Sequence, residues 1–245
     1  MKNGKLYFYL LLTYVAFQIV SVFLAQPLIT FFEGSTDDVK EAAYKGVAWS
    51  LFTTNFITLI IFLLLMRTNK SFLKNVFDGK AVSFWTSVLW GFIGFFLVMG
   101  AQILGAIIEQ SIGIEPGSEN TELVSDIAKV APIMILPIAL FAPILEEIVF
   151  RRAIFGGVYR KSNFWIAGVV SAAIFAVVHN DFEHIIIYLF SGLVFSYLYY
   201  RTKRLMTSMI AHLLLNSYVT VIQLNYDKIL ELQKQLQQTF ILFLQ

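Results

Sequence analysis

The chain has 245 residues, of which 58% are hydrophobic and only 14% are charged, and its mean hydropathy is +0.73. This composition excludes an ordinary soluble domain and predicts a polytopic membrane protein. The net charge of +2 gives no basis for nucleic-acid binding, and the absence of cysteine excludes disulfides, thiolate zinc sites and cysteine nucleophiles.

A bilayer core takes about 20 apolar residues per helix, so a chain of this length can hold roughly seven or eight spans. The first predicted span covers residues 6–32; it is too long for a signal-peptide core, so we expect it to remain in the membrane. The second and third predicted spans cover residues 47–66 and 81–108. A net acidic loop follows the third span, and Pro116-Gly117 predicts a turn within it.

The fourth apolar stretch, residues 127–159, would be about 50 Å long as a helix, which is too long for one straight span. Pro132, Pro137 and Pro143 are positions where a helix can kink or unwind. We therefore expect one bent helix that carries Glu146 inside the bilayer. The remaining predicted spans cover residues 164–179, 184–200 and 205–224.

The last residues, 227–245, are rich in glutamine and carry apolar side chains at near-helical spacing, which favours an interfacial amphipathic helix over an eighth span. We divide the chain into N-terminal spans (1–126), a membrane core made of spans four to seven (127–226) and this tail. No internal repeat is visible.

Basic and acidic loops alternate along the chain. Lysine and arginine cluster at the N-terminus and in residues 67–80, 160–161 and 201–204, which all fall on one side of the predicted bundle. Because short loops rich in Lys and Arg stay in the cytoplasm, this side is predicted to be cytoplasmic. We expect a multi-pass plasma-membrane protein with its N-terminus in the cytoplasm.

Two adjacent carboxylates, Glu146 and Glu147, lie in an almost wholly apolar run, with Arg151 about one helical turn further on. Ionisable groups inside a membrane segment are costly and are functional candidates by default. The i,i+4 spacing lets Arg151 neutralise and orient Glu147. Glu146 lies about 100° round the helix and is free to face another group.

Two further motifs lie on later spans, Phe175-x-x-x-His179 and His212-x-x-x-Asn216. A carboxylate, two imidazoles and an amide on three helices suit peptide hydrolysis, which needs a base for the water, a group to hold it and donors for the oxyanion. Each motif also has a structural reading: the Glu146-Glu147 pair as charges at a membrane interface, His179 as an interfacial histidine at the end of a span, and His212 with Asn216 as interhelical hydrogen bonds. His184 begins a span and matches no motif, so we interpret it as structural.

In this order, Glu-Glu-x-x-x-Arg, Phe-x-x-x-His and His-x-x-x-Asn resemble the motifs of the CAAX-processing and bacteriocin-processing (CPBP, or Abi) intramembrane protease family, to whose superfamily the type II CAAX prenyl proteases belong. The resemblance covers Glu146 to Asn216. It implies that Glu146 and His179 activate water, that His212 and Asn216 stabilise the oxyanion, and that Glu147 with Arg151 supports the site.

The resemblance further implies an endopeptidase acting on a membrane-associated peptide or protein, as in bacterial peptide maturation, secretion or protection against bacteriocins. The family is often called a metalloprotease. Glu146, His179 and His212 could bind zinc with one open position. Equally, Glu146 could act as a general base without a metal, and the sequence leaves both readings open.

Two rival functions use the same buried polar groups. An ion-coupled transporter would use them as a relay, and would be expected to show an inverted repeat. A non-catalytic immunity or scaffold protein would bind a partner through the same cavity. Only the completeness of the motif set argues against the second rival.

Overall fold

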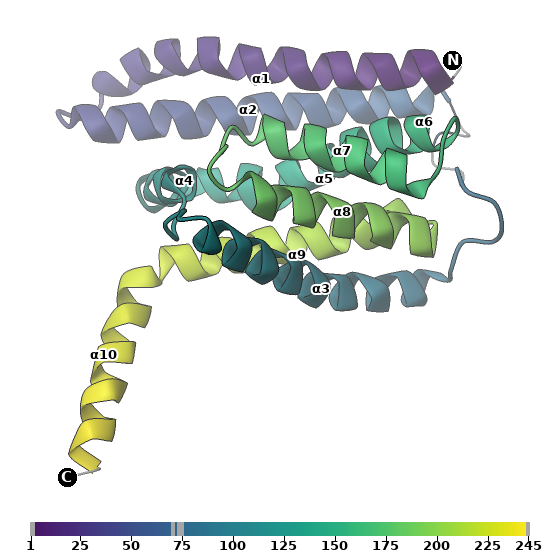
Figure 1. The fold of residues 1–245 in the computed structure, drawn as a ribbon. Helices are drawn as coiled ribbons and strands as arrows, with labels where there is room; N and C mark the ends of the chain where they lie inside the picture. The colour runs from purple at the N-terminus through teal and green to yellow at the C-terminus, as the bar shows by residue number, and fades with distance from the viewer. Residues whose placement is uncertain (1–2, 70–71, 73–75, 244–245) are drawn as a thin grey trace.

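A computed structural model describes residues 3–69, 72 and 76–243, and within this part of the chain the fold is entirely helical. Figure 1 shows the elements in chain order. The longer helices are α1 (Asn3–Glu33), α2 (Val39–Arg67), α3 (Phe84–Ser111), α4 (Glu119–Val130), α7 (Phe164–Val178), α8 (Ile185–Thr202), α9 (Leu205–Leu224) and α10 (Tyr226–Phe243). Between α4 and α7, short helical pieces follow one another: η1 (Pro132–Met134), η2 (Pro137–Phe141), α5 (Ala142–Glu146), η3 (Glu147–Phe155) and α6 (Gly156–Tyr159). We call residues 132–159 the central segment.

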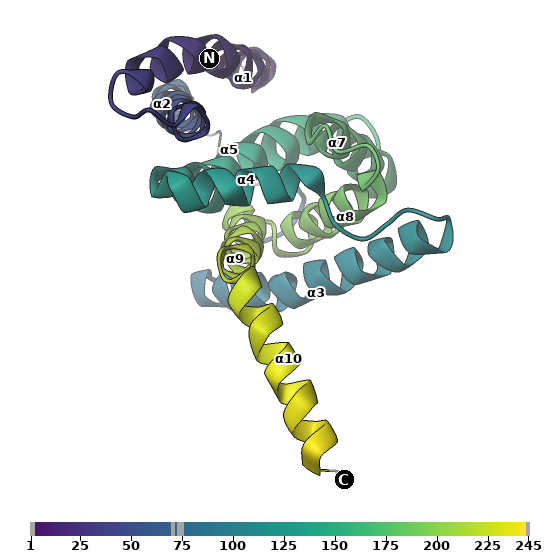
Figure 2. The same cartoon turned by 90° about the vertical axis from the view of Figure 1, so that its left-hand side faces the viewer.

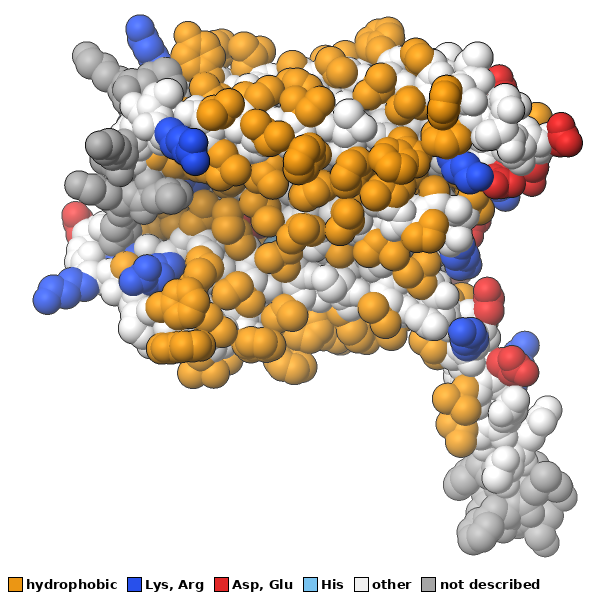
Figure 3. Space-filling model, turned by 180° about the vertical axis from the view of Figure 1, so that it is seen from behind, with side chains coloured by type: hydrophobic (Ala, Val, Ile, Leu, Met, Phe, Trp, Pro, Cys, Tyr) orange, Lys and Arg blue, Asp and Glu red, His pale blue; other side chains and the backbone are white. Residues whose placement is uncertain are grey.

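The helices make a multi-pass membrane bundle. Six stretches of the described chain are long and apolar enough to cross a bilayer: α1, α2, α3, the central segment, α8 and α9. α7 is apolar but has only 15 residues, so it falls short of that length and the count of seven or eight spans stays a prediction. Figure 3 shows exposed apolar side chains covering the flank of the bundle, with charged side chains gathered towards its two ends. This is the surface expected of a protein in lipid.

Short polar residues start several helices. The side chains of Asp38, Ser83, Ser118 and Asn163 each accept a hydrogen bond from a backbone N–H in the first turn of α2, α3, α4 and α7. Such caps satisfy amides that would otherwise lack partners at a helix start. They fix where each helix begins, and therefore which end of the bundle each connection occupies.

The bundle has two ends with different charge. The basic end holds the start of α1 and the connections at residues 76–83, 160–163 and 203–204. The acidic end holds the connections at residues 34–38, 112–118 and 179–184. Figure 2 looks onto the acidic end, where α4 lies across the bundle in front of the ends of the spans, and α10 extends away from it.

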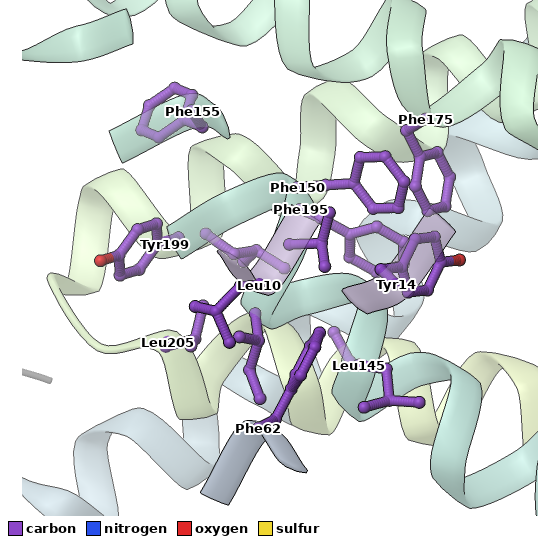
Figure 4. Packing of buried hydrophobic residues seen from close by; sticks show 14 of the residues in the cluster. Leu10, Tyr14, Phe62, Leu145, Phe150, Phe155, Phe175, Phe195, Tyr199 and Leu205 are labelled. Carbon is purple, nitrogen blue, oxygen red and sulfur yellow. The ribbon is translucent and has the colours of Figure 1, made fainter. Parts of the chain in front are cut away.

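The central segment runs through the middle of the bundle, and every residue from Leu145 to Ala153 is buried. Aromatic rings from three elements meet here. Phe150 of the central segment packs edge-on against Phe175 of α7, with ring centroids 5.3 Å apart, and Phe195 of α8 also contacts Phe175. Figure 4 shows these rings with Leu145 and Tyr14 in one cluster. Gly192 lets α8 approach α7, since a Cβ there would lie 2.9 Å from the Cα of Ala172. Close packing of small residues is a common means of joining membrane helices.

The structure corrects the prediction of one bent helix over residues 127–159. Residues 119–130 form α4, a separate amphipathic helix that begins within the predicted acidic loop. The helix ends at Ala131, whose backbone is not helical (φ −126°, ψ 86°). The reason is local: the residue before a proline is disfavoured in the helical region, and Pro132 follows. Wide π-helical turns span Pro137–Phe141 and Glu147–Phe155. Prolines 137 and 143 lack the N–H that a regular helical ladder needs.

Candidate active site

Glu146 ends α5 at the centre of the bundle and is 9% exposed. Its Oε2 atom is buried and has no hydrogen-bond partner among the described residues. The nearest basic group with a stated distance is Nε2 of His212 on α9, 3.7 Å from this oxygen. A buried carboxylate oxygen without a donor is costly, so a molecule that supplies the missing hydrogen bond is expected to bind there.

Glu147, the next residue, is fully buried and has strong partners. Arg151 Nη1 lies 3.3 Å from its Oε1, and Nδ1 of His212 lies 3.0 Å from the same atom. The Arg151 guanidinium also lies over the rings of Phe175 (4.3 Å) and Phe195 (5.0 Å). Glu147 therefore neutralises Arg151 and orients His212, which stands between the two carboxylates.

Because the carboxylate of Glu147 can only accept when ionised, Nδ1 of His212 carries the proton in this contact. Nε2 then faces Glu146. A histidine whose second nitrogen is fixed by a carboxylate has a defined tautomer and ring orientation. The two adjacent glutamates therefore lie in different environments: Glu147 is paired through Oε1 with Arg151 and His212, whereas Glu146 lines the cavity.

His179 lies at the end of α7, where the helix stops because Asn180 adopts a left-handed conformation (φ 53°) that asparagine tolerates better than most residues. Its Nδ1 lies 2.7 Å from the carbonyl oxygen of Phe175, one turn earlier. A carbonyl accepts only, so Nδ1 donates and Nε2 is left with a lone pair when the ring is neutral.

Asn216 is on α9, one turn after His212. Its Nδ2 donates a hydrogen bond to the carbonyl oxygen of Ile138, 3.1 Å away, in the π-helical turn of the central segment. An amide nitrogen has two N–H groups, so one remains for another acceptor.

A cavity of about 580 Å³ brings most of these side chains together. Glu146, His179 and Asn216 line it, whereas His212 lies beside Glu146 and is buried. The cavity reaches the acidic end, where α4 and the residues before it supply one wall. Its volume is in the range of small-molecule and peptide side-chain sites.

The wall at the acidic end contains polar residues that motif reading missed. His184, interpreted above as structural, is buried; its Nδ1 lies 2.9 Å from Glu109 Oε2 and its Nε2 lies 2.7 Å from the carbonyl oxygen of Gly117. Glu109 also accepts from the first amides of α8, those of Ile186 and Ile187. Asp181 and Tyr188 line the same wall.

Glu146, His179 and His212 are the candidate ligands for a metal ion. Among the described residues, no group of three or more histidine, aspartate or glutamate side chains is placed to hold a metal ion. Glu146, His179 and His212 as placed do not fit a three-ligand zinc site, which needs its donors about 2.0–2.2 Å from one point.

Fold and site together define a class: a multi-pass membrane protein with a buried carboxylate and imidazoles facing an internal cavity. The family model described as type II CAAX prenyl endopeptidase Rce1-like matches residues 128–218. Putative membrane peptidase YdiL of Bacillus subtilis is 37% identical over 224 residues, 90% of each chain. The chain therefore belongs to this Rce1-like family of membrane peptidases.

Two further relatives match over shorter lengths. Membrane-embedded CAAX protease MroQ of Staphylococcus aureus is 42% identical over 142 residues, 55% of this chain and 58% of the relative. UPF0177 protein YvdC of Lactococcus lactis is 31% identical over 135 residues, 54% of this chain and 51% of the relative. No solved structure matches the chain.

Proposed function

We propose that the chain is an intramembrane endopeptidase in which Glu146 is the general base that activates water. The observation that carries this proposal is the environment of Glu146: its side chain lines the cavity together with His179 and Asn216, and its buried Oε2 atom has no hydrogen-bond partner among the described residues. A water molecule there would supply the missing donor. General bases are expected where such a group lies within hydrogen-bond reach of the water it deprotonates.

In the proposed reaction, Glu146 takes one proton from water, while Nε2 of His179 accepts a hydrogen bond from the other O–H group, which stays on the oxygen and is held in place. The water oxygen forms a bond to the peptide carbonyl carbon, and the carbonyl electron pair moves onto its oxygen. Asn216 from the cavity wall, and His212 from beside Glu146, donate hydrogen bonds to this oxyanion. The carbonyl then re-forms, the C–N bond breaks, and the proton held by Glu146 passes to the leaving amine.

Glu147 and Arg151 have a supporting role in this scheme. Glu147 holds Nδ1 of His212, and Arg151 balances the charge of Glu147 inside the apolar core. The substrate would be a membrane-associated peptide or protein segment that enters the cavity, in a bacterial plasma membrane like those of the relatives named above.

The test compares wild type with Glu146→Gln in proteoliposomes, using a library of membrane-associated fluorogenic peptides. General acid–base catalysis contributes about 10²–10⁴-fold, so we expect kcat to fall by about that factor with the melting temperature unchanged. Glu33→Gln, at an exposed position at the end of α1, is the matched control and should keep full activity.

Two outcomes would contradict the proposal. If wild type cleaves no peptide in the library, the transporter and scaffold readings gain support. If Glu146→Gln cleaves as fast as wild type, the protein is a peptidase but Glu146 is not its base.

A further inference from the structure

Beside His179 lies an aromatic ring that the proposed reaction does not use. The ring of Tyr188, on α8, is stacked on the imidazole of His179 with centroids 4.3 Å apart and planes 30° from parallel. The ring of Phe175 also contacts this imidazole, at 4.4 Å and 56°. His179 is therefore held between rings from α7 and α8.

Tyr188 is itself tied to the connection that follows His179. Its hydroxyl donates to Oδ2 of Asp181 over 3.4 Å, a long hydrogen bond, and the same oxygen accepts a short one of 2.6 Å from Oγ of Ser118. Ser118 is the N-cap of α4. One carboxylate thus connects α8 with the start of α4, both of which line the cavity.

The stacking of Tyr188 on His179 restricts an imidazole at the very end of α7. One hydrogen bond, from Nδ1 to the Phe175 carbonyl, fixes a single atom of the imidazole, and the ring can still turn about that contact. Turning would swing Nε2 away from the water molecule that the proposed reaction places between His179 and Glu146. A ring stacked on the imidazole face opposes this motion, since the two planes would collide.

We propose that Tyr188, held by Asp181, is a positioning residue that sets the direction of Nε2 of His179. The proposal rests on the proposed function of His179. The Tyr188 ring contributes most to the orientation of His179, and its long hydroxyl hydrogen bond contributes less. Substitutions can therefore separate the ring from the hydroxyl group. A misplacement of about 1 Å can cost about a hundredfold in rate, because reacting atoms must be held near van der Waals contact.

The kinetic test uses Tyr188→Leu, which removes the ring, and Tyr188→Phe, which keeps it. We expect kcat to fall about 10–100-fold for Tyr188→Leu and only about two- to fivefold for Tyr188→Phe, with KM changed less than about twofold in both. Tyr197→Leu is the matched control, because Tyr197 is on the same helix at an exposed position, and it should behave as wild type. Equal losses for Tyr188→Leu and Tyr188→Phe, or a change confined to KM, would overturn the proposal.

A double-mutant cycle tests the part assigned to Asp181. Asp181→Ala should lower kcat by about the same factor as Tyr188→Phe, and adding it to Tyr188→Phe should cause no further loss, since both substitutions remove the hydrogen bond between Tyr188 and Asp181. Additive losses would show that Asp181 acts by another route, such as Ser118 and α4.

A readout without substrate separates this proposal from the proposed function. The chain has only three histidines, so the imidazole C–H signals of His179 can be assigned in NMR spectra by comparison with His184→Gln and His212→Gln. A stacked ring shifts those signals upfield; they should move downfield in Tyr188→Leu and stay in place in Tyr188→Phe and Tyr197→Leu. Unmoved signals in Tyr188→Leu would disprove the stacking even if Glu146-dependent cleavage is observed. Moved signals would support it even if no peptide is cleaved.

Discussion

At the scale of single residues, the site depends on how three buried ionisable side chains are paired. Glu147, Arg151 and His212 are each at most 3% exposed. Nη1 of Arg151 and Nδ1 of His212 lie 3.3 Å and 3.0 Å from the same atom, Oε1 of Glu147. The attraction between charges in a protein interior offsets their desolvation only when the geometry is good, so removing one member leaves an uncompensated charge. Glu146 is free to react because Glu147 already neutralises Arg151.

Arg151→Met should therefore be strongly destabilising. We expect the free energy of unfolding in detergent to fall by about 3–5 kcal/mol, because Glu147 loses its cation while staying buried. The double variant Glu147→Gln with Arg151→Met should recover part of that loss, since no unpaired charge remains. Unfolding followed by tryptophan fluorescence measures both values.

Arg67→Met, at the exposed end of α2, is the control for loss of an arginine and should change stability by less than about 0.5 kcal/mol. The explanation fails if the double variant is as unstable as Arg151→Met alone. It also fails if Arg151→Met is no worse than the control.

The spacing of these residues was informative because a helix places i and i+4 together, so the approach of Arg151 to Glu147 could be predicted from the sequence. The stacking of Tyr188 on His179 could not, since one sequence does not reveal which faces of α7 and α8 meet. The same is true of His184: its partner Glu109 is 75 positions away in the chain. Contacts of this kind are set by packing and carry no local signal.

At the scale of secondary-structure elements, the apolar runs located the spans well, and α9 begins and ends at the predicted residues. The start of α4 was missed because its charged residues resemble a loop. Ser118 followed by Glu119 and Glu122 is nevertheless a helix-start pattern, with a cap and acidic residues in the first turn, and it could have been recognised. The break at Ala131 has no comparable signal beyond Pro132 itself.

His184 joins three elements at the acidic end: α3 through Glu109, α8 at whose start it lies, and the connection before α4 through Gly117. Burial lowers the pKa of His184, but the hydrogen bonds to the Glu109 carboxylate and the Gly117 carbonyl, with the nearby charge of Asp181, raise it, and the net shift is upward from 6.5. The protonated ring is therefore favoured in the folded state.

The pH dependence follows from the direction of that shift. A group whose pKa is higher in the folded state contributes stability that is fully present below its unfolded value and is lost as the pH rises through the folded value. We expect the melting temperature to fall as the pH rises above 6.5, measured from about pH 5 to about pH 9, the range in which histidine titrates. In His184→Gln this part of the pH dependence should disappear. An unchanged profile in the variant would assign it to other groups.

At the scale of the whole molecule, the basic residues lie at one end of the bundle and the cavity lies towards the other. Lysine and arginine gather at the basic end, while the cavity and the carboxylates Glu109, Glu115 and Asp181 lie towards the acidic end. Short loops rich in Lys and Arg are retained in the cytoplasm. If the basic end is cytoplasmic, the cavity opens towards the outer side, and substrates reach Glu146 from there.

Cysteine labelling tests this orientation directly, because the chain contains no cysteine and single substitutions give a clean background. Asp37→Cys and Glu183→Cys place a thiol at exposed positions of the acidic end, and Lys161→Cys places one at the basic end. A membrane-impermeant maleimide added to intact cells should label the first two variants and leave the third unlabelled until the membrane is permeabilised. Labelling of Lys161→Cys alone in intact cells would reverse the orientation and would place the mouth of the cavity in the cytoplasm. Labelling at both ends before permeabilisation would mean that the chain inserts in two orientations, since the charge difference between its ends would then be too small to select one.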